Sequence, residues 1–493
     1  MKDVEPFAVI VGLIAAALLL AVLSNRITDK IRVPAPALFL VIAAVASDLI
    51  PQLGSLPIQT VERIVTLALI FILFDGGMHI GWRRFRTAAG AVLWIGVAGT
   101  VVTAGALALA AHLFFGFDWR VALLIGTALA PTDPAVVFSV LGRREISGRS
   151  GTILEGESGA NDPVGIALMV ALLGASGGGL HEVLGGIGEF GLQMAVGGVV
   201  GILGASGLIV LMRQLPLPNE ALYPIRTLAG AAIIYGLATV AHGSGFLAVF
   251  LAGILIGDAR APYKREIERF AGGISTLGEI VAFTVLGLTV SVHDVLRADT
   301  SWVGLALAAL LILIIRPLFV GALIARIDLA RGERLFVLWS GLKGAVPILL
   351  GTFILTGDIA DSHRIYEIIF VVVLVSVVVQ GGLVPTFAQV LRVPMQTTPL
   401  EPWTAGLRFQ DEPDGLHRHL VGAGSEADGC AIADLPMVDA WISMVNRDGQ
   451  LLQVRADTVL RAGDEVLILG DPGTQVVEAF TGRPGDNGQR SPG

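Results

Sequence analysis

A group of oxygen-bearing side chains interrupts an otherwise apolar stretch of the chain. Within eight residues this stretch contains Glu155, Glu157, Ser158, Asn161 and Asp162. Residues four apart share a helical face, so Ser158 lies over Asp162 and Glu157 over Asn161. Carboxylate, amide and hydroxyl oxygens suit hard monovalent cations. The alternative is that these side chains only join helices to one another. Three acids and one amide so close together favour an ion-binding site.

Two prolines, Pro131 and Pro134, flank Thr132 and Asp133 in a second apolar stretch. Prolines three residues apart remove backbone donors and break a helix. Non-helical backbone at membrane depth is tolerated only where it lines a cavity or is buried in protein, and broken helices of this kind form ion sites in transporters. Thr132 offers a hydroxyl and a free carbonyl, and Asp133 can compensate the exposed helix end. A plain proline kink is the alternative, and the adjacent acid argues against it.

Arg316 lies deep inside a third apolar stretch, immediately before Pro317. A guanidinium group stays charged even when it is buried, so Arg316 needs a carboxylate partner. We predict that this partner is Glu157, which leaves Asp162 free to titrate.

A second helix break is expected a little further along the chain. The run from residue 341 to 347 combines Lys343 with the helix-breaking residues Gly341, Gly344 and Pro347. We expect this break to face the break at residues 131–134. Two broken helices fit two related halves with an ion site at their interface.

The composition shows which elements must position these residues. The mean hydropathy is +0.77, and 15% of the residues are charged, whereas soluble domains average about 25%. A membrane span needs about 20 mostly apolar residues. We therefore expect an all-α polytopic membrane protein with about thirteen spans, two of them broken and crossing. The expected spans are 6–24, 34–50, 58–78, 89–115, 120–141, 150–174, 189–212, 223–242, 244–257, 271–291, 302–325, 335–356 and 365–391.

Basic residues set the expected orientation of these spans. Lys and Arg gather in alternate loops, for example at Arg83, Arg84 and Arg86, and such loops are cytoplasmic. This places the N-terminus in the periplasm and the C-terminus in the cytoplasm, with the protein in a bacterial inner membrane. The first stretch has no basic n-region and no clear cleavage site, so we expect it to remain as a span.

The chain changes character after residue 391, where Asp, Glu, Gly and Pro separate short apolar runs. Short strands are expected at Ala440–Val445, Leu451–Val454 and Glu465–Leu469. The predicted domains are a membrane domain at 1–391, a linker at 392–415, a small α+β cytoplasmic domain at 416–480 and a disordered tail at 481–493.

Taken together, the motifs resemble the monovalent cation/proton antiporters, in the branch that carries Asn-Asp rather than Asp-Asp. The motifs that carry the resemblance are Phe74 to Gly77, Thr132 to Pro134, Glu157 to Pro163, Arg316-Pro317 and Gly341 to Pro347. The resemblance implies that Asp162 binds a cation and a proton in turn, beside Asn161. It also implies that Thr132, Ser158 and Asp133 complete the coordination and that Glu157 pairs with Arg316.

Further expectations follow from the same resemblance. Members of the family are typically homodimers in lipid, move by an elevator-like shift and need no cofactor. Lys343 is a departure, because the family often has Arg at this position. The C-terminal part resembles the TrkA-C domain of potassium-uptake regulatory subunits, through motifs such as Ala462 to Gly470. That domain implies regulation by a small-molecule or nucleotide ligand and favours K⁺ over Na⁺ as the substrate.

The expected mechanism needs a single carrier group. Burial in a poorly hydrated cavity favours the neutral form of Asp162, so a proton and a cation compete for one carboxylate. If Arg316 neutralises Glu157, exchange is electroneutral and 1:1.

Three alternatives to K⁺/H⁺ exchange remain open. The nearest of them is a Na⁺(Li⁺)/H⁺ antiporter. A ligand-gated channel and an intramembrane serine protease built on Ser158 and His242 are more distant. The sequence has no Walker-type loop and no sign of nucleic-acid binding.

Overall fold

The computed structural model describes residues 19, 34–50, 52–141, 144–146, 149–174, 180–296, 298–357, 359–397, 416–435, 440–447, 450–470 and 479–480. The expected first span (apart from residue 19), most of the expected linker and the expected tail lie outside these residues. The chain forms two compact units, Met1–Gln396 and Thr397–Gly493. Each unit is described by itself.

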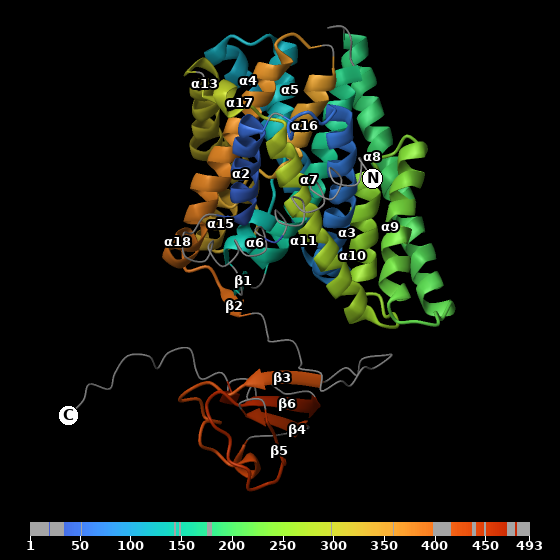
Figure 1. Ribbon diagram of the computed structural model, residues 1–493, viewed down its shortest axis with the longest axis vertical. Helices are drawn as coiled ribbons and strands as arrows, with labels where there is room; N and C mark the ends of the chain where they lie inside the picture. Colours follow the sequence, from blue (N-terminus) through green and yellow to red (C-terminus); the bar gives the residue numbers. More distant parts are fainter. Residues whose placement is uncertain are drawn as a thin grey trace, which may run out of the picture. The chain divides into compact units, whose positions relative to one another are not determined.

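The first unit is helical, as its composition predicts (Figure 1). Six helical stretches among the described residues are long and apolar enough to cross a bilayer, and four shorter apolar helices accompany them. The all-α polytopic prediction is therefore confirmed, whereas the number of about thirteen spans stays a prediction. The α-helices are α2 (Ala35–Leu49), α3 (Ile58–Leu93), α4 (Thr100–Phe115), α5 (Trp119–Leu129), α6 (Ala135–Leu141), α7 (Arg149–Gly174), α8 (Leu180–Gln214), α9 (Leu222–Val240), α10 (Gly245–Gly257), α11 (Lys264–Leu288), α12 (Val292–Val295), α13 (Ala298–Leu310), α14 (Gly321–Ile324), α15 (Arg331–Trp339), α16 (Ala345–Thr356), α17 (Ser362–Val375) and α18 (Gly382–Val390).

Both predicted helix breaks are present. Helix α5 ends at Leu129 and α6 begins at Ala135, with the two prolines between them. Helix α15 ends at Trp339 and α16 begins at Ala345, after the glycine-containing segment. The missing backbone donors of proline and the conformational freedom of glycine explain why neither span continues as one helix.

Three segments adopt the wider π-helical turn: η1 (Trp94–Gly99), η2 (Leu311–Val320) and η3 (Ser376–Gly381). A π turn is uncommon and often occurs at functional sites. Here η2 carries Arg316, and η3 carries polar groups that contact the second helix break. Irregular helix thus surrounds the residues selected from the sequence.

Close helix packing also positions the polar stripe of α7. Gly159 faces the ring of Phe250 on α10, and a Cβ at Gly159 would overlap with that ring. Only a residue without a side chain lets the two helices approach this closely. The short strands β1 (Arg144–Ile146) and β2 (Met395–Thr397) pair with each other.

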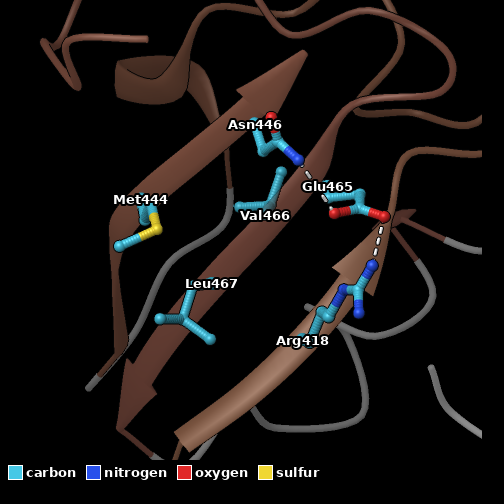
Figure 2. A pocket seen from close by; sticks show the side chains of 6 residues that line it. All are labelled: Arg418, Met444, Asn446, Glu465, Val466 and Leu467. Atoms are coloured by element: carbon cyan, nitrogen blue, oxygen red, sulfur yellow. Dashed lines mark hydrogen bonds and ion pairs between the residues drawn. The ribbon is translucent and has the colours of Figure 1, made fainter. Parts of the chain in front are cut away.

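The second unit contains a four-stranded antiparallel sheet in the order β3-β6-β4-β5. Its strands are β3 (Leu416–Leu420), β4 (Ala440–Arg447), β5 (Gln450–Leu452) and β6 (Glu465–Gly470). The apolar core of this unit includes Ile442, Val445, Val466, Ile468 and Phe480. A small pocket on the sheet is lined by Arg418, Met444, Asn446, Glu465, Val466 and Leu467 (Figure 2).

Candidate functional site

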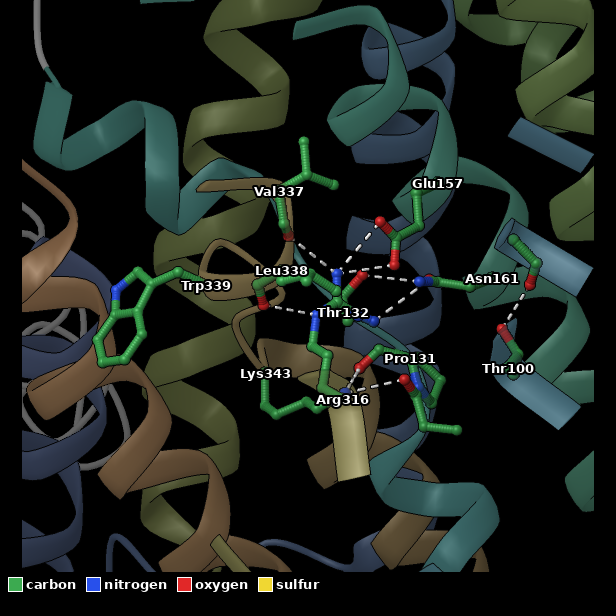
Figure 3. Close-up of polar contacts among 12 residues, drawn as sticks. Thr100, Pro131, Thr132, Glu157, Asn161, Arg316, Val337, Leu338, Trp339 and Lys343 are labelled. Carbon is green, nitrogen blue, oxygen red and sulfur yellow. Dashed lines mark hydrogen bonds and ion pairs between the residues drawn. The ribbon is translucent and has the colours of Figure 1, made fainter. Parts of the chain in front are cut away.

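The membrane unit buries an ion pair between α7 and η2. Arg316 Nη2 lies 2.9 Å from Glu157 Oε1 and donates to Glu157 Oε2 at 3.2 Å. The same guanidinium group donates from Nε to the carbonyl of Leu338 at 2.9 Å and from Nη2 to that of Val337 at 3.3 Å (Figure 3). Both charged side chains are about as buried as core residues, at 3% exposed each. Arg316 therefore neutralises Glu157 and satisfies the carbonyls that end α15.

A second contact joins α7 to the break between α5 and α6. The amide of Asn161 accepts from the backbone N–H of Thr132 at 3.2 Å and donates from Nδ2 to Thr132 Oγ1 at 2.7 Å. Figure 3 shows these two residues facing each other. Because the break leaves backbone groups without helical partners, a side-chain amide with one donor end and one acceptor end can satisfy them. In this structure both ends of the amide are engaged by Thr132.

Asp162 has a different environment from its neighbours. Its side chain is 6% exposed, yet its Oδ1 has no hydrogen-bond partner among the described residues. The charges that act on it most are those of Asp133 and Lys343. Ser158, one turn earlier on α7, is also buried. An acid that is buried without a hydrogen bond at one oxygen is poised to bind a proton or a cation.

The two unwound segments lie against each other. Lys343 Nζ donates to the carbonyls of Ala130 at 2.9 Å and Pro131 at 3.0 Å, and the N–H of Asp133 donates to the carbonyl of Leu342 at 2.8 Å. Lys343 is 1% exposed. Its ammonium group thus occupies the carbonyl end of α5, where a positive charge is favourable.

The two glycines at the second break have no space for a side chain. A Cβ at Gly341 would overlap with the guanidinium group of Arg316, and a Cβ at Gly344 would overlap with the carboxylate of Asp133. The glycines selected from the sequence as helix breakers therefore also admit the charged groups of the site.

Several polar residues that support the site were not selected from the sequence. The N–H of Lys343 donates to Ser376 Oγ at 3.0 Å, and that hydroxyl donates to Gln380 Oε1 at 2.8 Å. Gln380 also donates to the carbonyl of Trp339. The signal in the sequence was that Ser376 and Gln380 are two polar residues four apart in an apolar span.

The sequence analysis also did not select Glu279 on α11, an acid inside an expected span.

Comparison with known proteins identifies the family. The family model described as "Sodium/hydrogen exchanger, transmembrane" matches residues 10–390. The chain belongs to this exchanger family. A second model, for the TrkA-C domain, matches residues 416–480 of the exchanger, so the resemblance proposed for the C-terminal part is confirmed.

Individual relatives agree with this assignment. A K(+)/H(+) antiporter NhaP of Alkalimonas amylolytica is 33% identical over 479 residues, covering 92% of the exchanger and 80% of the relative. K(+)/H(+) antiporter NhaP2 of Shewanella sp. (strain MR-4) is 32% identical over 481 residues, covering 95% and 82%. Na(+)/H(+) antiporter NhaP of Pseudomonas aeruginosa is 27% identical over 346 residues, covering 65% and 79%.

The solved structure of the sodium proton antiporter MjNhaP1 from Methanocaldococcus jannaschii at pH 8 shares the fold, with a TM-score of 0.66 and 22% sequence identity. The match covers 78% of the exchanger and 99% of MjNhaP1.

These matches settle the class of protein. The exchanger is a multi-pass membrane protein and a secondary transporter that exchanges a monovalent cation for protons, not an enzyme. The protease and channel alternatives are therefore rejected. His242, the histidine considered for a protease, is exposed just after α9, whereas Ser158 is buried in α7.

Proposed function

We propose that the exchanger moves K⁺ against H⁺ with a 1:1, electroneutral stoichiometry, and that Asp162 carries both ions in turn. Two relatives that match over more than nine-tenths of the exchanger are named K(+)/H(+) antiporters. The relative named a Na(+)/H(+) antiporter matches over 65% of the chain. The presence of the TrkA-C domain favours the same choice. Na⁺ (or Li⁺) is the alternative cation.

The observation that carries the proposal is the contrast in pairing within α7. Glu157 is neutralised by Arg316, whereas Asp162 Oδ1 has no hydrogen-bond partner in the described part of the chain. Burying an isolated carboxylate is costly, so the group must bind a proton or a cation. When each ion displaces the other at one carboxylate, one cation is exchanged for one proton.

The remaining ligands of the cation are proposed from the groups around Asp162. Thr132 Oγ1 accepts a hydrogen bond from Asn161, and a hydroxyl oxygen has a second lone pair that can bind a cation. Ser158 lies on the same face of α7 as Asp162. Asp133 contributes negative charge at the crossing of the two broken helices.

We further propose the cellular setting of this activity. The protein lies in a bacterial inner membrane as a homodimer, with a periplasmic N-terminus and a cytoplasmic C-terminal domain. A small-molecule or nucleotide ligand of that domain regulates exchange. Transport needs no cofactor, and the transported ions are its only required ligands.

Transport by everted membrane vesicles tests this proposal. Addition of K⁺ should release protons from wild-type vesicles, and Asp162→Asn should abolish this release at every pH. The matched control is Glu268→Gln, which changes a partly exposed acid on α11. This variant should behave as wild type. Sustained exchange in Asp162→Asn would refute the role of Asp162. Release that depends on Na⁺ or Li⁺ but not on K⁺ would establish the alternative cation.

A further inference from the structure

Glu279 is a partly buried acid of the membrane unit that the mechanism above does not use. It lies in the second half of α11, a helix that packs against α3 and α16. Its Oε1 is buried and has no hydrogen-bond partner among the residues that the structure describes. Gly278, the preceding residue, lies against Ala68 of α3, and the charge of Asp133 acts on Glu279. Glu279 therefore lies where α11 packs against α3, within range of the charge at the crossing of the broken helices.

A structural role does not account for this acid. An ionic contact near the start of α11 joins Glu268 to Lys264 at 3.3 Å, with Glu268 44% exposed. Glu279 has no such contact with a cationic side chain in the described residues, and the charge of Asp133, which acts on it, has the same sign. A carboxylate in an apolar interior without a compensating charge is strongly destabilising. It is stable only with a bound proton or a bound cation, which are the two ions that the exchanger carries.

A further acid, Glu62, lies at the opposite end of α16 from Asp133. Glu62, in the second turn of α3, accepts a hydrogen bond from Thr356 Oγ1 at 3.2 Å at the C-terminal end of α16. At the N-terminal end of α16, Gly344 lies against the carboxylate of Asp133. The twelve residues of α16 span about 18 Å at 1.5 Å per residue. Glu62 and Asp133 are therefore separated by about the length of this apolar helix.

We propose that Glu279 is an intermediate site at which a proton or a monovalent cation binds on its way between the end of α16 that carries Thr356 and Glu62 and the carrier Asp162. The inference rests on the function proposed above and extends it with a second binding carboxylate. Asp133 links the two acids, because its charge acts on both Glu279 and Asp162. The site offers a carboxylate to a dehydrated ion and so raises the local concentration of cations near the carrier.

The experiment compares Glu279→Gln with the control Glu268→Gln on the same helix, in everted vesicles, by titrating K⁺ at one fixed pH. Loss of one attractive charge near the route should raise the half-saturating K⁺ concentration of Glu279→Gln about tenfold, with a maximal rate within about twofold of wild type. Glu279→Asp should restore most of the lost affinity. Glu268→Gln should match wild type in both quantities.

Two results would overturn the inference. The first is an unchanged half-saturating concentration in Glu279→Gln. The second is an equal loss of maximal rate in Glu279→Gln and Glu279→Asp, which indicates a structural role. Failure of the underlying function is seen separately, since wild-type vesicles would then show no cation-dependent proton release.

Discussion

The membrane unit and the C-terminal unit each bury an acid against an arginine, but the two pairs have different surroundings. In the C-terminal unit Arg447 binds Asp464 through two hydrogen bonds of 2.7 Å, one to each carboxylate oxygen. The N–H of Arg461 adds a third at 2.8 Å. In the membrane unit Arg316 divides its donors between Glu157 and the carbonyls of the second helix break.

The comparison indicates which buried acid is available for the proposed ion exchange. Both pairs satisfy a buried acid and hold two elements together, so pairing itself is a structural device in either environment. What distinguishes the membrane unit is a second acid on the same helix, Asp162, whose Oδ1 has no hydrogen-bond partner in the described residues. In the proposed mechanism Arg316 neutralises Glu157, and this pairing leaves Asp162 as the exchangeable charge.

Of the changes that test this comparison, removal of Arg316 should have the largest effect, and the effect is on the stability of the membrane unit. Arg316→Met leaves Glu157 as an uncompensated charge at 3% exposure, which should lower the free energy of unfolding by about 3–5 kcal/mol. The thermal unfolding of detergent-solubilised protein measures this loss. The double variant Glu157→Gln with Arg316→Met should recover much of it, because neither member of the pair then remains as a charge without its counterpart. A double variant as unstable as the single one would show that the carbonyl contacts of Arg316 dominate.

An added methyl group at the crossing should have an intermediate effect. Gly344→Ala places a Cβ on the carboxylate of Asp133, and overpacking of this kind costs about 1–3 kcal/mol. We expect a clear reduction in K⁺-dependent proton release with the protein still folded. Gly90→Ala is the matched control, because a Cβ at Gly90 meets no atom within 4 Å. Equal transport in the two variants would mean that the position of Asp133 does not matter.

The pair in the C-terminal unit should show the smallest effect, and only at acid pH. Burial raises the pKa of Asp464, but the hydrogen bonds and charges of Arg447 and Arg461 outweigh burial and lower the pKa below its usual value. A lowered folded-state pKa stabilises the domain above the unfolded pKa of about 3.9. This stability is lost as the pH falls through the folded pKa.

Amide hydrogen exchange in the full-length exchanger checks this expectation. Protection of strand β6 should be constant between about pH 5 and 7 and should fall below about pH 4 by about 1 kcal/mol. Arg447→Met should lower protection near neutral pH and remove most of the acid-dependent loss. A loss of equal size in wild type and Arg447→Met would assign the acid sensitivity to other groups.

The sequence predicted the helix breaks because their causes are local. Proline and glycine limit the backbone wherever they occur, and a charge in an apolar stretch is visible without a structure. Strand β3 was not predicted because His417, Arg418 and His419 give it a polar composition. It is an edge strand that pairs only with β6 among the described strands, so its pattern is set by that pairing rather than by burial on both sides.

The site was predictable in its charged residues and less so in its neutral ones. The sequence led us to pair Arg316 with Glu157, and the structure places them in contact. Asn161 was treated as a neutral neighbour of Asp162, whereas the structure engages its amide with Thr132 at both ends. Contacts to free carbonyls, and the three π-helical segments, depend on the exact path of the backbone. No residue type encodes that path by itself.

The hydrogen bonds between the two unwound segments have a mechanical consequence. Lys343 and the N–H of Asp133 attach each segment to the carbonyls of the other, in a region from which water is largely excluded and where such bonds are costly to break. In the proposed transport cycle we therefore expect both segments to move together. The cation would keep its protein ligands while the segments move. Only the side of the membrane from which the site is accessible would change.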